Sequence, residues 1–195
     1  MNDAHTRSQL FRRGGVLAGA GVALGAVPIG FAIGQGSLPA GDVKILNYAL
    51  TLEYLEAAFY ADALDKGELS GEAAEFAEVV GAHEQAHVDA LKEVLGGKAV
   101  KAPKVDFGDA TGKKKFLATA QVLEDTGVAA YQGQAPLIKT TEVLASAGAI
   151  LAVEARHAAW VRDILGEDPA PDAFEMPMDM KAVLDAVKAT GFLKG

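Results

Sequence analysis

The chain of 195 residues contains no cysteine. This absence excludes disulfide bonds, thiolate metal sites, iron–sulfur clusters and a lipidated cysteine. Aromatic residues are also scarce, at 7%, whereas half of all residues are hydrophobic. Basic residues number 18 against 26 acidic ones, and the resulting net charge of −8 repels phosphate backbones. We therefore expect no nucleic-acid partner.

The first 40 residues are predicted to be an export signal and linker. Arg7, Arg12 and Arg13 precede residues 14–32, an uncharged stretch in which six residues are glycine. A basic segment followed by a modest apolar one is typical of export signals, and this one resembles a twin-arginine signal. The export machinery is then a partner, and the expected location is periplasmic or extracellular. The alternative is an uncleaved signal that anchors the protein to the membrane.

Residues 41–166 are predicted to form one all-α domain, because Ala, Leu, Val, Glu and Lys dominate this part of the chain. Asp42 is a suitable N-cap for the first helix. Helix start and stop signals give four stretches, at about 42–64, 70–96, 113–134 and 140–166. The long connection at 97–112, between two short ones, indicates a four-helix bundle with a crossover.

The tail at 167–195 contains three prolines followed by a short amphipathic stretch. We expect this stretch to form a short helix that packs on the bundle through Val183, Leu184, Val187 and Phe192.

Every predicted helix carries acidic residues on the seam that should face the core. The seam of the fourth helix, for example, has Glu154 and His157 at its centre, between Ile150 and Val161. Buried carboxylates that lie close together cannot all stay ionised without compensation. Two divalent ions carry four positive charges and would balance the negative charges of four such carboxylates.

The sequence also repeats itself. Glu53 aligns with Glu124 at an offset of 71, and the pair Glu84/His87 aligns with Glu154/His157 at an offset of 70. Glu56 lies on the same seam as Glu53 but aligns with Gly127, so we assign Glu53 as the ligand and Glu56 as a supporting or reserve group. The predicted metal ligands are Glu53, Glu84, His87, Glu124, Glu154 and His157.

The two Glu-x-x-His pairs, the two further carboxylates, residues 52–60 (LEYLEAAFY) and residues 153–158 (VEARHA) resemble the ferritin-like superfamily. More closely, the chain resembles exported bacterial ferritin-like proteins related to the desiccation-associated group. The resemblance spans residues 42–166 and implies a ferritin-like bundle. Glu84 and Glu154 would bridge two ions, Glu53 and Glu124 would be terminal ligands, and each histidine would complete one metal.

Ligands that are mostly carboxylates, with one imidazole per metal, suit two Fe or two Mn ions better than a structural zinc site. The resemblance implies reactions with oxygen or peroxide, of the ferroxidase, peroxidase or catalase type, or hydroxylation of a substrate, and leaves the choice among them open. A homo-oligomer also remains open, although no pattern in the sequence indicates a cage.

The sequence also admits two other interpretations. His83, Glu84 and His87 form an H-E-x-x-H motif, which in a zinc protease would hold the metal. The repeat opposes this interpretation, because it has Val153 where His83 stands, and we expect His83 to support the ligands. The other alternative is a metal-free structural bundle with a buried Glu/His network. Tyr60 and Tyr131 are either core residues or donors to a ligand carboxylate.

Overall fold

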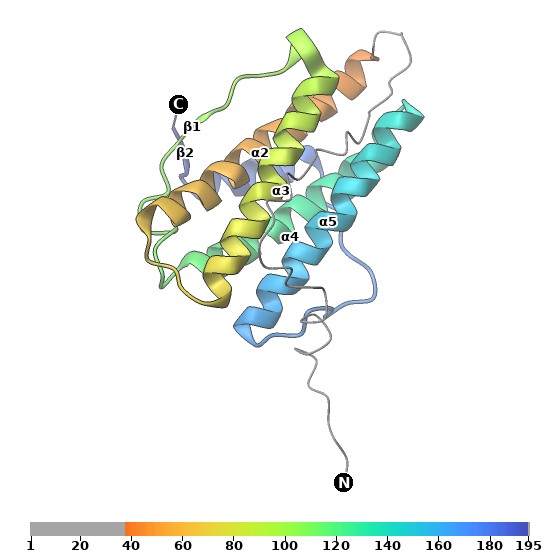
Figure 1. The fold of residues 1–195 in the computed structure, drawn as a ribbon. Coiled ribbons are helices and arrows are strands. Elements are labelled where there is room, and N and C mark those ends of the chain that lie inside the picture. The colour runs from red at the N-terminus through yellow and green to blue at the C-terminus, as the bar shows by residue number, and fades with distance from the viewer. Residues whose placement is uncertain (1–37, 195) are drawn as a thin grey trace, which may run out of the picture. The chain divides into compact units, whose positions relative to one another are not determined.

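The computed structural model describes residues 38–194. Four long helices form a bundle in which α2 packs along α3 and α4 packs along α5 (Figure 1). They are α2 (Ala40–Lys66), α3 (Glu72–Leu95), α4 (Phe116–Gln134) and α5 (Thr141–Leu165). The all-α prediction is confirmed. The predicted export signal lies almost entirely outside the described residues, and none of the helices in 38–194 is long and apolar enough to span a membrane.

The connections follow the predicted order of short, long and short. Gly67 and Gly71 adopt positive φ angles of 64° and 61° in the turn between α2 and α3. The long crossover contains η1 (Gly96–Lys98) and β1 (Lys104–Val105), and η2 (Ala135–Leu137) joins α4 to α5. β1 pairs antiparallel with β2 (Leu193–Lys194) near the end of the chain, a contact that the sequence did not predict.

The predicted role of Asp42 as an N-cap was wrong. Helix α2 begins earlier, at Ala40, and Asp42 lies inside its first turn with no exposed surface. Its carboxylate accepts hydrogen bonds from the backbone N–H groups of Lys139 and Thr140, at 3.0 and 2.9 Å. These bonds outweigh the effect of burial and lower the pKa of Asp42. Asp42 therefore joins the start of α2 to the connection that precedes α5.

The tail returns to the bundle as predicted. Helix α6 (Met180–Ala189) is capped by Asp179, whose side chain accepts from the N–H of Ala182. Val183 and Val187 are buried in the core, and Leu184 and Phe192 pack against it.

The interior divides into two apolar regions. An aromatic region around Phe59, Tyr60, Phe76 and Phe116 contains rings at centroid distances of 5.3 to 6.3 Å. The second region is mostly aliphatic and is built around Leu46, Leu50, Leu91, Val143 and Ile150. Along α3 and α5 the predicted metal ligands fall between the residues of these two regions. The polar residues thus sit in the middle of an otherwise apolar bundle.

Candidate metal centre

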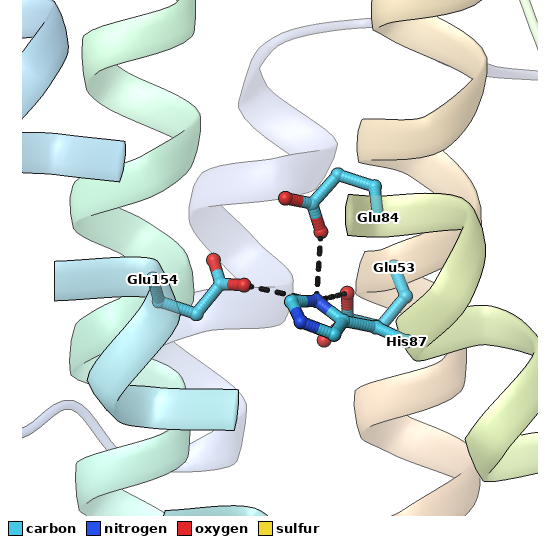
Figure 2. A group of neighbouring side chains, drawn as sticks. All are labelled: Glu53, Glu84, His87 and Glu154. Atoms are coloured by element: carbon cyan, nitrogen blue, oxygen red, sulfur yellow. Dashed lines mark hydrogen bonds and ion pairs between the residues drawn. The ribbon is translucent and has the colours of Figure 1, made fainter. Parts of the chain in front are cut away.

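The structure brings all six predicted ligands together. Two overlapping groups form, each offering one ligand atom per residue with all four atoms within 4.8 Å of one another. The first is Glu53, Glu84, His87 and Glu154, and the second is Glu84, Glu124, Glu154 and His157. Glu84 and Glu154 belong to both groups. In the first group, α2, α3 and α5 each direct a carboxylate toward the imidazole of His87 (Figure 2).

Both imidazoles present the same nitrogen to the carboxylates. Nδ1 of His87 lies 3.2 Å from an oxygen of each of Glu53, Glu84 and Glu154. Nδ1 of His157 lies 3.1 Å from Glu84 and 3.2 Å from Glu124. Burial opposes a charge on His87, but its interactions with the carboxylates of Glu154, Glu53 and Glu84 raise its pKa to about 12. Nδ1 of each histidine is the atom that faces the carboxylates and could bind a metal.

The carboxylates carry more negative charge than the two histidines can balance. Glu53, Glu84, Glu124 and Glu154 are at most 1% exposed. Burial first, and then repulsion from neighbouring carboxylates, raises the pKa of Glu84 and Glu154 well above the usual range. Glu53 differs, because hydrogen bonds with His87, Glu84 and Tyr131 outweigh its burial and lower its pKa.

Within residues 38–194, three buried carboxylate oxygens have no hydrogen-bond partner: Oε1 of Glu84 and both oxygens of Glu154. Two of them lie 3.1 to 3.2 Å from an imidazole Nδ1, close enough for an ion pair, although the geometry makes no hydrogen bond. Unpaired buried oxygens are costly, and a metal ion satisfies them. The residues present therefore fit a site for hard divalent ions.

The two tyrosines are bound to the cluster in a crossed pattern. The hydroxyl of Tyr60 donates to Glu124, and the hydroxyl of Tyr131 donates to Glu53. Each tyrosine thus serves the glutamate of the other half of the repeat, on a different helix. The sequence suggested that a ligand carboxylate accepts from these tyrosines but did not reveal the crossing.

Glu56 is buried beside the cluster but belongs to neither group of potential ligands. A Cβ atom at Gly127 would lie 3.0 Å from Oε2 of Glu154 and 3.3 Å from Oε1 of Glu56. The absence of a side chain at Gly127 therefore leaves the space that these two carboxylates occupy. Burial and then repulsion from Glu154 raise the pKa of Glu56 well above its usual range.

His83 also stands outside both groups. Its Nδ1 lies 2.9 Å from Nε2 of His157, and the two rings stack at a centroid distance of 5.2 Å. His83 therefore contacts the outer side of His157, while His87 faces the carboxylates. A zinc protease requires both histidines of the H-E-x-x-H motif to bind the same ion. Here the two histidines do not face a common position.

Sequence reasoning missed Tyr48. Its side chain is buried, and its hydroxyl has no hydrogen-bond partner within the described chain. Burial, followed by the nearby carboxylates of Asp179 and Glu56, raises the pKa of Tyr48. A tyrosine on the apolar side of a helix gives no sequence signal for such a position.

Comparison with known proteins supports the same fold. A family model described as a ferritin-like domain matches residues 41–167. No curated protein matches the chain. The model covers most of the chain, including all four bundle helices and both Glu-x-x-His pairs, so the chain belongs to the ferritin-like domain family.

Proposed function

We propose that the protein binds two Fe or two Mn ions at this centre and carries out redox chemistry with oxygen or peroxide. The observation that carries the proposal is the pair of overlapping ligand groups that share Glu84 and Glu154. Glu53 and His87 would complete one metal position, and Glu124 and His157 the other. The bound ions would supply Lewis acidity and one electron each.

The protein's own residues would hold the ions and keep water out. The four ligand carboxylates are almost completely buried, which places the ions in a medium of low dielectric constant. Tyr60 and Tyr131 would orient the terminal carboxylates through their hydrogen bonds. Protons that Glu84 and Glu154 hold in the metal-free protein would leave when the metals bind.

The electron balance defines the reaction that we expect with iron. Two Fe(II) ions held by these residues would supply two electrons, which together with two protons are enough to reduce dioxygen to hydrogen peroxide. With peroxide as the oxidant, the same two electrons and two protons would be enough to give two waters. Manganese in place of iron would favour disproportionation of peroxide to water and dioxygen.

We further propose that the protein acts outside the cytoplasm. The support is the pattern in residues 1–32, where three arginines precede an uncharged, glycine-rich stretch. A fusion of residues 1–40 to a reporter that is active only after export tests this part. Loss of export in the variant with Arg12 and Arg13 both changed to Lys would indicate the twin-arginine route.

Anaerobic loading followed by addition of an oxidant tests the reaction. The protein is loaded with Fe(II) or Mn(II), and consumption of dioxygen or peroxide is followed together with the absorption of Fe(III). We expect activity in the wild type and in Glu78→Ala, an exposed control on α3, and none in Glu84→Ala. Equal activity in the wild type and Glu84→Ala would contradict the proposal. Loading that leaves no bound metal would favour the metal-free structural bundle.

A further inference from the structure

A small cavity lies one helical turn from the candidate metal centre. Ala49, Leu91 and Ile150 line it, and each stands four residues from a predicted ligand on its own helix, namely Glu53, His87 and Glu154. Tyr131 also lines it and donates its hydroxyl to Glu53. The cavity and the centre therefore share a wall.

The internal repeat explains why this space exists. Ala130 and Ile45 line the cavity, and at an offset of 71 they correspond to Phe59 and Phe116. Those two phenylalanines are fully buried in the other half, where their rings stack at a centroid distance of 5.5 Å. The half with the cavity lacks both rings. The volume that aromatic side chains fill on one side of the centre is thus partly empty on the other.

The size and polarity of the cavity select its occupant. Its volume of about 20 Å³ has room for a molecule about the size of water, and its walls are almost entirely apolar. Tyr48 and Gln134 also line the cavity, but their polar atoms contribute almost nothing to its walls, and the hydroxyl of Tyr131 is already bound to Glu53. Water or peroxide there would therefore find few hydrogen-bond partners. A small apolar molecule loses no hydrogen bonds when it enters the cavity. Half-buried Ile138 also contributes to the lining, so the cavity extends toward the surface.

We infer that this cavity is a dioxygen chamber, which holds the gas beside the metal centre before it reacts. The inference rests on the proposed function and narrows it, because it makes dioxygen the oxidant that the fold admits through this route. Peroxide needs hydrogen-bond partners that this cavity does not offer, so filling the cavity should affect the two oxidants differently.

Dioxygen under pressure tests the chamber without any metal, because it is the proposed occupant itself. Crystals of the metal-free full chain are pressurised with dioxygen, and a peak for a diatomic molecule is expected between Ala49, Ala130 and Ile150. Ala130→Phe, which restores the ring found in the other half, should abolish the peak. Ile45→Phe serves the same purpose if Ala130→Phe does not fold. Val122→Phe, at an exposed position on α4, is the control and should keep the peak.

The second measurement compares oxidants on the Fe(II)-loaded protein. Filling the cavity should slow oxidation by dioxygen about tenfold and leave oxidation by peroxide unchanged. The absence of dioxygen from the wild-type cavity, or equal slowing with both oxidants, would overturn the inference. A failure to bind metal would instead overturn the proposed function, and it would leave the result from the crystals standing as a property of the cavity.

Discussion

Tyr60 and Tyr131 connect the two halves of the repeat at the candidate metal centre through hydrogen bonds. Each hydroxyl donates to a terminal carboxylate on another helix, so the orientation of Glu124 depends on α2 and that of Glu53 on α4. Residues that hold metal ligands in place through hydrogen bonds commonly change metal affinity when they are mutated. The crossed tyrosines are therefore predicted to tune metal binding while they touch no metal.

Replacing Tyr60 with Phe removes this hydrogen bond and leaves the aromatic packing intact. We expect metal affinity to fall about tenfold, because Glu124 loses the donor that orients it. Isothermal titration with Mn(II) measures the change. Tyr54→Phe is the matched control, since half-buried Tyr54 is on the same helix and donates to no candidate ligand in the described chain. Equal affinities in Tyr60→Phe and the wild type would refute a role for this bond.

The sequence predicted which residues meet at the centre. The reason is that Glu and His at the middle of an apolar seam contradict the pattern around them, and the repeat marks them a second time. It did not predict the crossed tyrosines, the unpaired hydroxyl of Tyr48 or the contact of His83 with His157. Each of these depends on how neighbouring helices pack, and spacing along one helix does not define that packing.

At the scale of elements, the tail crosses α4 at a glycine. Met178 donates its backbone N–H to the carbonyl of Ala129, and its own carbonyl oxygen would lie only 1.8 Å from a Cβ atom at Gly133. No other residue type fits beneath this crossing. Gly133 therefore fixes where the tail lies before α6 begins.

Gly133→Ala should displace the tail and lower the free energy of unfolding by about 1–3 kcal/mol, the usual cost of overpacking. Gly148→Ala is the control, because this glycine lies within α5 and a Cβ atom there meets no heavy atom within 4 Å. It should raise stability by about 0.5–1 kcal/mol, since alanine favours the helix. Urea unfolding measures both. A neutral Gly133→Ala would mean that the tail does not pack at this position.

The four bundle helices were predictable because apolar periodicity and glycine or proline stops mark them clearly. Their ends were less so: α4 begins at Phe116 rather than near residue 113, and Asp42 lies inside α2. A carboxylate near the start of a helix can cap that helix or accept hydrogen bonds from a distant part of the chain, and the sequence does not distinguish the two. Only the fold shows that Lys139 and Thr140 are the donors to Asp42. The strands β1 and β2 have two residues each, too few to show a period.

For the whole molecule, the excess of buried carboxylates predicts how the metal-free protein responds to pH. Glu56, Glu84 and Glu154 have raised pKa values, so the folded chain keeps protons that the unfolded chain releases above about pH 4.5. His87 acts in the same direction, since its stabilising contribution is complete below 6.5 and is lost as the pH approaches about 12. The free energy of unfolding should therefore fall as the pH rises above about 4.5.

Urea unfolding with a chelator present, between pH 5 and pH 9, measures this dependence. Each proton that the folded state holds in excess lowers stability by about 1.4 kcal/mol per pH unit. Glu53 and Asp42 have lowered pKa values and act oppositely only as the pH falls below about 4.5, outside this range. The pKa of His83 is also lowered, so this one group acts oppositely within the range, at pH values below about 6.5. Bound Mn(II) should remove the decline, because the ions replace the protons. Metal-free stability that rises across this range would contradict the charge balance described above.

The metal content of the purified protein tests the central claim most directly. Elemental analysis should find about two Fe or Mn ions per chain after loading, with both lost or greatly reduced in Glu154→Gln, because Glu154 belongs to both ligand groups. His83→Ala should keep both ions, since His83 belongs to neither group. A single zinc ion that is lost in His83→Ala and kept in Glu154→Gln, or no bound metal at all, would contradict the account.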